Sequence, residues 1–376
     1  MKTYCKRLTI TPDRIDAAVG AWLKGRAGKK NGWRIKAEYG SRENLVSEIE
    51  IEIRERRLKF APIKRHPRHE PTNGKLRIIC VESIKQQICD YLAVQCLEDF
   101  LNAKTGFYQI GSSKGKGGLF AKKTIEKWIT EGGYYVKSDV KQCYPSIKPA
   151  RVKKILRKYI KSADVLYLCE TLLDTYEDGL DIGSYFSLKI SCLVISFAYH
   201  HIEAAGKLRR GKWKSAITHQ IWNMDDCLFM SRDKRDLKRA VRDLQQYMEK
   251  ELGLTLKPWK ICKVSDGEPI NMCGYRVYTG KTRLRRRLFI CQARAYRRFE
   301  KHRTTRRARR CCSYWGYLLS ANAERYRAAR GVDRTQGDAC RKISRSEKGT
   351  KDGNGKRVQL GTDPRRESRT ATVGGK

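Results

Sequence analysis

The sequence predicts an α+β protein made of more than one subdomain. Strand-like and helix-like segments alternate through the middle of the chain, a hairpin pattern is centred on Asp225, and a very basic helical segment follows it. The length of 376 residues also exceeds the usual size of one compact domain. We therefore expect two or three cooperating subdomains around a real hydrophobic core.

The N-terminal region, residues 1–74, combines short helical stretches with basic segments that contain proline. Pro62, Pro67 and Pro71 prevent residues 61–71 from continuing as a helix. We therefore predict an N-terminal extension that ends in a linker.

Strands and helices alternate after this region. A turn signal at Asn73 precedes a β-branched strand, and Ser83 then caps an amphipathic helix. The Gly-rich stretch 111–118 leads into a short helix, and Tyr134–Val140 (YYVKSDV) is predicted as a buried strand. Pro149 suits the first turn of the next helix. Two further helices are expected over residues 184–203 and 237–248, the second followed by Gly253.

The C-terminal part becomes increasingly basic. Short strands are expected around Cys262 and over residues 272–278, and residues 283–310 form a helical segment rich in arginine, with Tyr314, Trp315 and Tyr317 after it. Beyond Arg334 the chain is polar and poor in apolar residues, so burial cannot offset the entropy of ordering it. We predict disorder in that tail.

The charge balance limits the classes of partner. Lys and Arg total 82 against 40 Asp and Glu, which gives a formal net charge of +42. Nucleic acid and an anionic membrane are the candidates, because both let basic side chains replace bound counterions. The basic run of residues 283–310 favours nucleic acid, since its arginines suit a phosphate backbone.

A membrane location and a zinc site are not expected. The longest apolar run, Ser191–Tyr199, is far shorter than the roughly 20 residues of a membrane span. Charged residues interrupt the N-terminus before a signal peptide can form, so we expect a cytoplasmic protein. The 14 cysteines contain no CxxC pair, and Cys89 and Cys96 lie on an apolar helical stripe. We therefore expect buried thiols.

Acidic residues inside apolar strands are the informative ones in so basic a chain. Asp139 ends the strand YYVKSD, and Asp225 and Asp226 lie within IWNMDDCLFM. Adjacent buried carboxylates repel each other, and a divalent cation such as Mg²⁺ offsets that cost because it prefers oxygen ligands. The alternative is a solvated Asp-Asp turn with Asp139 as an ordinary strand end.

Taken in order, six sequence blocks resemble the reverse transcriptase family over roughly Lys75 to Tyr278. The blocks are GKLRII, SDVKQCYPSI, GLDIGSYFS, NMDD, LGLTLKPWK and MCGYRVY. The resemblance implies a right-hand polymerase, with fingers and palm (an antiparallel sheet covered by helices) over residues 75–260. It also implies a primer-grip hairpin and a basic helical thumb over residues 261–333, before the tail of residues 334–376.

The same resemblance assigns site residues. It makes Asp139, Asp225 and Asp226 the catalytic carboxylates, which would hold two Mg²⁺ ions, with Mn²⁺ as an alternative. It places an aromatic ring at Tyr144, where the ring blocks a ribose 2′-hydroxyl and so selects deoxynucleotides. The remaining implied contacts are with the nucleotide, through Lys75, Arg77, Gly183, Ser187 and Lys257, and with the primer, through Gly274 and Tyr275.

The resemblance also implies partners and two functions to distinguish. Ile182 and Gly183 with Ser187 are similar to the pattern of diversity-generating retroelement and related bacterial or phage enzymes. The expected activity is synthesis of cDNA from an RNA template, with a DNA primer and dNTPs as substrates, and an accessory protein is left open. Asn223, Leu188 and Cys192 depart from the common residues of the family. They favour the alternative, a catalytically impaired RNA-binding protein on the same fold.

Overall fold

The computed structural model describes residues 2–24, 28–70, 74 and 76–321. The chain divides between Arg285 and Arg286 into two compact units. Lys75, expected to contact the nucleotide, and the tail after Arg334, expected to be disordered, lie outside the described residues.

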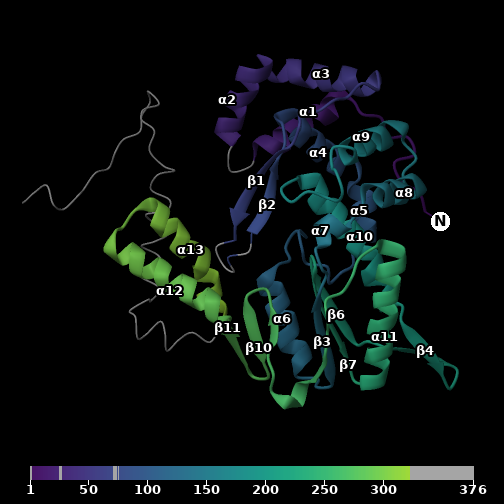
Figure 1. Ribbon diagram of the computed structural model, residues 1–376, viewed down its shortest axis with the longest axis vertical. Helices are drawn as coiled ribbons and strands as arrows, with labels where there is room; N and C mark the ends of the chain where they lie inside the picture. Colours follow the sequence, from purple (N-terminus) through teal and green to yellow (C-terminus); the bar gives the residue numbers. More distant parts are fainter. Residues whose placement is uncertain (1, 25–27, 71–73, 75, 322–376) are drawn as a thin grey trace, which may run out of the picture. The chain divides into compact units, whose positions relative to one another are not determined.

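Helices make up most of the first unit (Figure 1). They are α1 (Pro12–Leu23), α2 (Gly28–Tyr39), α3 (Arg42–Arg54), α4 (Ile84–Cys96), α5 (Glu98–Lys104), α6 (Gly118–Ile129), α7 (Cys143–Ser146), α8 (Pro149–Tyr159), α9 (Ala163–Leu173), α10 (Tyr185–Glu203) and α11 (Lys234–Tyr247). Helices α1, α9 and α10 pack against α4 and form the upper part of the core. A π-helical turn, Met248–Leu252, extends α11.

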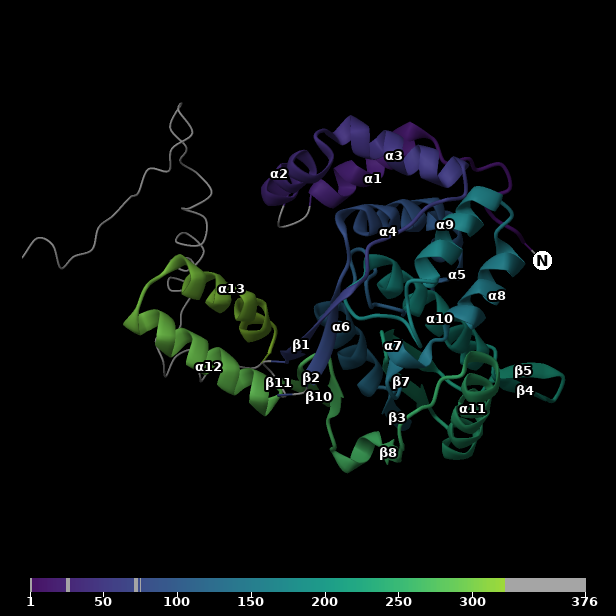
Figure 2. The same cartoon turned by 45° about the horizontal axis from the view of Figure 1, so that its top comes forward.

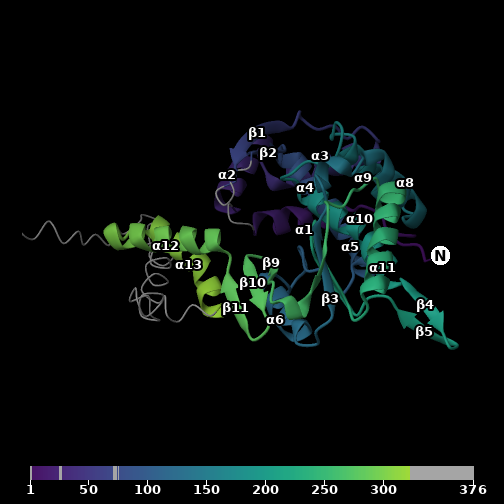
Figure 3. The ribbon, with the colours of Figure 1, turned by 60° about the horizontal axis from the view of Figure 1, so that its bottom comes forward.

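The central sheet of the first unit is antiparallel and has the strand order β6-β7-β3-β8. Its strands are β3 (Tyr134–Asp139), β6 (His219–Asn223), β7 (Asp226–Ser231) and β8 (Ile261–Lys263). Helix α11 packs against β3 and β7, as Figure 3 also shows. The sheet therefore buries one face under a helix, as the alternating strands and helices of the sequence predict.

Three smaller sheets complete the first unit. The first pairs β1 (Lys64–His69) with β2 (Leu76–Val81), the second pairs β4 (Gly206–Arg209) with β5 (Lys212–Ser215), and the third has the order β11-β10-β9. The strands of the third sheet are β9 (Ile270–Met272), β10 (Tyr275–Tyr278) and β11 (Lys281–Leu284).

Local sequence signals set several helix ends. The Ser83 hydroxyl accepts a hydrogen bond from the backbone N–H of Gln86 at 3.2 Å, so the predicted cap of α4 is confirmed. Pro149 occupies the first turn of α8, and Gly253 ends the α11 region with a left-handed φ of 67°. Cys89 and Cys96 are buried in the core, as expected.

The linker expected over residues 61–71 is wrong in its central part. Residues 64–69 form strand β1, in which Pro67 stands opposite Ile78 of β2. A proline suits this position because β1 is an edge strand of a two-stranded sheet, so the missing N–H removes no bond to a second neighbour. The proline pattern excluded a helix but did not exclude a strand.

The second unit contains two described helices, α12 (Arg286–Lys301) and α13 (Thr305–Ser320). The Thr304 hydroxyl caps α13 by accepting from the N–H of Arg307 at 3.4 Å. Across the residues that the structure describes, none of the helices combines the length and the hydropathy that a bilayer crossing requires.

Candidate active site

Three carboxylates meet at one end of the central sheet. Asp139 ends β3 and stands opposite Asp226, the first residue of β7. Asp225 lies in the turn between β6 and β7, and its carbonyl accepts a hydrogen bond from the N–H of Val140 at 2.9 Å. Directly opposite residues of an antiparallel pair have Cβ atoms about 5 Å apart. The backbone therefore brings the three predicted acids together.

Two lysines form ion pairs with two of these carboxylates. The Lys137 ammonium forms an ion pair with Asp226, and the Lys257 ammonium forms one with Asp139. The Asp139 Oδ1 atom is buried, and among the described residues this ammonium is its partner. Burial lowers the pKa of Lys137, which the nearby acids oppose.

Sequence reasoning missed Lys137. It lies two residues before Asp139 on β3, and alternate residues of a strand share one face. That spacing was the available signal, because it places a cation beside the acid within a largely buried strand.

Backbone hydrogen bonds fix the position of Lys257. Its N–H donates to the Asp139 carbonyl at 2.9 Å, and its own carbonyl accepts from the Ser138 hydroxyl at 3.0 Å. The segment before it also bridges to β3, through Leu256 opposite Val140. The structure thus places Lys257, which was expected to contact the nucleotide, beside the carboxylates.

The environment of Asp225 shifts the pKa of its carboxyl group. Burial, and then the negative charge of Asp139, raise its pKa, while the charges of Lys257 and Arg77 lower it. The influence of Arg77 shows that β2 carries this guanidinium within electrostatic range of the carboxylates. Arg77 also pairs with Glu70 at 3.0 Å.

The donors of this site fit a divalent cation. Within the described ranges, no three His, Cys, Asp or Glu side chains already stand in the arrangement of a metal site. Two of the three carboxylates instead carry an ammonium group, which supplies positive charge at the same position. Carboxylate oxygens are the ligands that Mg²⁺ prefers, so the residues fit an ion that displaces these ammonium groups.

Neighbouring segments support the turn that carries Asp225. Met224 adopts a left-handed φ of 58°, and its sulfur lies 3.5 Å from the Cys192 thiol. A Cβ at Gly111 would come within 2.7 Å of the Met224 nitrogen. Only glycine therefore fits at the start of the Gly-rich stretch, and Cys192, one of the family departures, contacts the turn directly.

A cavity of about 610 Å³ lies beside this turn. Its lining combines cations and an aromatic ring with residues that contact the turn, including Phe107, Gly111, Lys114, Lys116, Lys189 and Cys192. Phe107 is 62% exposed, and the Lys116 ammonium lies 3.8 Å from the centre of its ring. The cavity offers positive charge and a ring surface close to the acids.

Tyr144 lies on α7 close to these acids. It is half-buried, and burial raises the pKa of its phenol to about 12, with the charge of Asp225 contributing in the same direction. Its phenol is therefore neutral at ordinary pH. The Tyr144 carbonyl accepts from the N–H of Leu180 at 3.0 Å, which holds the short helix in place.

The structure does not bring Gly183 and Ser187 to the site in the way the sequence suggested. Gly183 has a φ of 129°, and a Cβ there would meet the Cys80 carbonyl oxygen at 2.4 Å, so its close backbone contact is with β2. Ser187 is fully buried in α10. Its hydroxyl is therefore covered by core side chains, and its contact with a nucleotide stays a prediction.

The expected primer-grip residues lie in a tight turn between β9 and β10. Gly274 has a φ of 87°, and its carbonyl accepts from the N–H of Arg285 at 2.9 Å. Tyr275 is 3% exposed, so its ring belongs to the packing of this small sheet. The charges of Arg285 and Lys137 both lower the pKa of the Cys273 thiol, although burial raises it more. The turn therefore lies within electrostatic range of Lys137.

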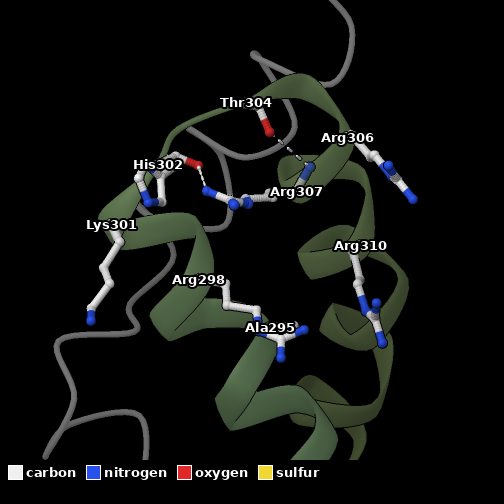
Figure 4. Close-up of a pocket in the computed structure, with 8 residues that line it drawn as sticks. All are labelled: Ala295, Arg298, Lys301, His302, Thr304, Arg306, Arg307 and Arg310. Atoms are coloured by element: carbon white, nitrogen blue, oxygen red, sulfur yellow. Dashed lines mark hydrogen bonds between the residues drawn. The ribbon is translucent and has the colours of Figure 1, made fainter. Parts of the chain in front are cut away.

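A second cavity, of about 700 Å³, belongs to the second unit and is shown in Figure 4. The residues that line it come from α12, α13 and the loop that joins them: Ala295, Arg298, Lys301, His302, Thr304, Arg306, Arg307 and Arg310. Five of these are lysine or arginine, and none is acidic. Such a cavity suits an anion.

A family match follows this geometry along the chain. Residues 63–277, more than half of the chain, match the family described as reverse transcriptase (RNA-dependent DNA polymerase). None of the curated proteins matches the chain. A solved structure of apo telomerase from Candida tropicalis, truncated from its C-terminal domain, is similar with 15% sequence identity and a TM-score of 0.42. The similarity covers 60% of this chain and 54% of that one, so this chain spans about half of the telomerase structure.

The family match begins at Ile63 and therefore includes β1, which the sequence analysis had assigned to a linker. It ends within β10 and contains all three carboxylates. With its antiparallel palm sheet and covering helices, the molecule has a right-hand polymerase fold, and the chain belongs to the reverse transcriptase family.

Proposed function

We propose that this chain is an RNA-directed DNA polymerase that makes cDNA from an RNA template, as part of a bacterial or phage retroelement. The observation that carries the proposal is the grouping of Asp139, Asp225 and Asp226 at one end of the central sheet. In this reaction the 3′-hydroxyl oxygen of a primer bonds to the α-phosphorus of a dNTP, and pyrophosphate leaves.

Members of this family generally use divalent metal ions, and the three carboxylates are the residues that would hold them. When bound, two Mg²⁺ or Mn²⁺ ions would activate the primer hydroxyl and neutralise charge on the pyrophosphate. Lys137 and Lys257 would leave the carboxylates with which they pair. Lys257, held beside Asp139 by its backbone, would then present an ammonium proton to the leaving pyrophosphate.

Tyr144 supports a DNA product. Its half-buried ring is held by α7 near Asp225, where the sugar of an incoming nucleotide would lie. The ring would clash with a ribose 2′-hydroxyl and leave room for deoxyribose. We expect Tyr144→Ala to raise incorporation of rNTPs relative to dNTPs by tenfold or more, on the order of the 1.4 kcal/mol that one such clash costs. Equal discrimination by Tyr144→Ala and wild type contradicts this role.

Positive surfaces on each of the two units support a nucleic-acid substrate. The cavity beside the Met224 turn offers Lys114, Lys116 and Lys189 together with the exposed ring of Phe107. Cations and rings together bind single strands, because phosphates pair with the cations and bases stack on the rings. In the second unit, the five-cation cavity suits the phosphates of a duplex.

Primer extension tests the proposal. Wild type should extend a DNA primer on an RNA template with dNTPs and Mg²⁺, and Asp225→Ala should lose nearly all of this activity. The Asp225 carboxyl is mostly buried, so Asp225→Asn serves as the variant that keeps its shape. Equal extension by wild type and both variants excludes the catalytic role.

A second candidate is a reverse-transcriptase-like RNA-binding protein that does not polymerise. The ion pairs of Lys137 and Lys257 favour it, because they occupy the carboxylates that a metal would need. RNA binding without extension by wild type, over a range of Mg²⁺ and Mn²⁺ concentrations, selects this candidate.

A further inference from the structure

A short basic hairpin projects from the first unit beside α11, as Figures 1 and 2 show. This arm, residues 206–215, consists of β4 and β5 joined by a turn in which Arg210 and Gly211 have left-handed φ angles of 50° and 73°. Such a two-residue turn matches the twist of the strands and keeps the hairpin tight. The arm hydrogen-bonds as a sheet of two strands only, so both its faces lie outside the central sheet.

The base of the arm is fixed to the palm. Asp236, a buried residue of α11, pairs with Lys207 at 2.6 Å and lies 3.9 Å from the Lys214 ammonium. A backbone bond from Ala216 N–H to the Ala205 carbonyl, at 2.9 Å, closes the hairpin. These contacts hold the arm in one orientation, since the buried carboxylate needs both lysines.

The outer part of the arm has unbalanced charge. Lys207 and Lys214 stand directly opposite each other, and the Asp236 carboxylate between them offsets part of their charge. Arg209 and Lys212 form the next opposite pair, and among the described residues no acid is paired with either of them. Like charges directly opposite in a sheet are destabilising. An external anion would relieve that repulsion.

The other face of the arm is apolar and exposed. Leu208 and Trp213 are opposite residues, with 73% and 62% of their surfaces exposed. The Trp213 ring lies over Gly206, where a Cβ would come within 2.6 Å of it. The indole is therefore supported on one side by backbone and open on the other, as a stacking surface requires.

Helix α11 continues the positive surface next to the arm. A shallow cavity of about 390 Å³ on this helix is lined by four cations, one acid and one amide: Arg235, Lys238, Arg239, Arg242, Asp243 and Gln246. Arg239 also reaches Asp236, at 3.4 Å, and so connects this face to the base of the arm. The cations of two elements thus form one surface.

We propose that the arm and the basic face of α11 bind a structured RNA where paired nucleotides adjoin an unpaired one. Arg209, Arg210 and Lys212 pair with backbone phosphates, and Trp213 stacks on the unpaired base. Two exposed apolar side chains give too little area for a membrane or a protein core, whereas phosphates and a base use both faces. The inference rests on the proposed function, because that function makes RNA the available polyanion.

This surface is separate from the catalytic carboxylates. Residues 216–218 connect the arm to the first residue of β6, and the turn with Asp225 follows the last residue of β6. A strand rises about 3.3 Å per residue, so the two ends of this five-residue strand are roughly 13 Å apart. The arm would therefore hold a part of the RNA other than the nucleotides being copied.

The test compares Trp213→Ala and the triple variant Arg209→Gln, Arg210→Gln, Lys212→Gln with matched controls. Trp33→Ala is the control for the ring, because Trp33 is also an exposed tryptophan, at 70%. Lys154→Gln, Lys158→Gln, Lys161→Gln removes the same charge from exposed lysines in and after α8. The probe is a fluorescein-labelled RNA stem-loop with unpaired adenosines, measured by anisotropy at several salt concentrations.

We expect Trp213→Ala to weaken stem-loop binding by about tenfold. The triple variant should reduce the slope of log affinity against log salt by roughly 2 to 3. A blunt RNA duplex should show the charge effect without the Trp213 effect, and all variants should still extend a short annealed primer-template at saturation.

Equal stem-loop affinity in the arm variants and the control variants overturns the inference. If the arm variants lose affinity for anionic lipid vesicles and keep their affinity for RNA, that result overturns it too. An equal effect of Trp213→Ala on the blunt duplex overturns the stacking role. Asp225→Ala separates the two proposals, because it should abolish extension and leave stem-loop binding unchanged. Binding that depends on the arm in a protein without extension activity rejects the proposed function alone.

Discussion

At the scale of single residues, the site is defined by lysines as much as by aspartates. Asp226 and Asp139 each carry an ammonium partner, from Lys137 and Lys257. Burial and the charge of Asp139 raise the pKa of Asp225, and the charge of Lys257 opposes this shift. The three acids can therefore remain close together without a bound metal ion. A metal ion that binds there must compete with the two lysines for the carboxylates.

Removing one of these lysines should make the protein more dependent on metal. Lys137→Met keeps the length of the side chain and leaves Asp226 without its partner. We expect a loss of about 1 to 3 kcal/mol of stability in EDTA, because a partly buried carboxylate becomes unpaired. We also expect Mg²⁺ to raise the Tm of this variant more than that of wild type.

Differential scanning fluorimetry in EDTA and in Mg²⁺ measures both effects. Lys141→Met is the control, because Lys141 is an exposed lysine just after β3. An Mg²⁺-induced shift in Lys137→Met that is no larger than in wild type contradicts the competition between lysine and metal.

At the scale of elements, two glycines without space for a side chain hold the turn that carries Asp225 and strand β2 in place. Gly111 lies against Met224, and Gly183 lies against Cys80 of β2. The N–H of Cys80 also donates to the Ile182 carbonyl at 2.8 Å, which joins β2 to the start of α10. The spacing between fingers and palm within the first unit therefore depends on backbone contacts.

Gly111→Ala should displace the turn that carries Asp225. The added methyl would come within 2.7 Å of a backbone nitrogen, which cannot move aside as a flexible side chain can. We expect a stability loss of about 1 to 3 kcal/mol and a fall in extension rate of up to roughly 100-fold. Chemical denaturation and primer extension measure the two effects.

Gly117→Ala is the matched control from the same Gly-rich stretch, because no heavy atom lies within 4 Å of a Cβ built there. It should retain both stability and activity. Equal behaviour of the two alanine variants would show that the contact between Gly111 and Met224 does not position the acids.

Three elements also meet at a buried pair of acids. Glu82 follows β2, and Asp90 lies on α4. Asp90 accepts hydrogen bonds from the Ser184 hydroxyl at 2.6 Å and the Phe186 N–H at 3.0 Å, both at the start of α10. Burial, and then the negative charge of Asp90, raise the pKa of Glu82. Folding therefore favours the protonated form of the Glu82 carboxyl group.

The raised pKa of Glu82 makes the stability of the folded protein depend on pH. Because the pKa of Glu82 is raised on folding, its contribution is fully present below the unfolded value of about 4.3 and is lost as pH rises through the folded value. We expect the Tm of wild type to fall as the pH rises above the unfolded value of about 4.3. Glu82→Gln, which keeps a donor without a titrating proton, should show a smaller fall.

Circular dichroism melts from about pH 5 to about pH 9 cover this window. Glu98→Gln is the control, since Glu98 is exposed on α5. Parallel curves of Tm against pH for wild type and Glu82→Gln would contradict a raised pKa of Glu82 in the folded protein.

At the scale of the whole molecule, the net charge is +42, and several separate surfaces are rich in lysine and arginine. The cavity near the carboxylates, the arm with α11 and the cavity between α12 and α13 each gather lysine or arginine. Self-repulsion of this size destabilises a compact chain and is relieved by a polyanion. Each surface should therefore contribute its own part of the salt dependence of binding.

The second unit provides a test of this separation. Arg298→Gln, Arg306→Gln, Arg310→Gln removes three of the five cations that line its cavity. We expect a weaker affinity for an annealed primer-template duplex and a salt slope smaller by roughly 2 to 3, because fewer counterions are released. Fluorescence anisotropy against salt measures it, with the lysine triple in and after α8 as control. If the arginine variant and the lysine control have the same salt slope, the cavity of the second unit does not bind the duplex.

The sequence by itself determined the candidate acids, the main helices and strands, and the expectation of a polyanionic partner. Caps, periodicity and charge are local properties, so the Ser83 cap, the hairpin centred on Asp225 and α10 could be predicted from neighbouring residues alone. The order of the six motifs gave the family. The residues assigned to nucleotide and primer remain proposals that the geometry supports unequally.

Only the tertiary structure decided which side chains meet. The register of β3 against β7 places Lys137 beside Asp226, and the packing of α10 buries Ser187 in the core. Gly183 faces β2 and not open space, and Pro67 lies within a strand where a linker was expected. These outcomes depend on contacts between segments far apart in the chain, and the periodicity of a single segment contains no information about them.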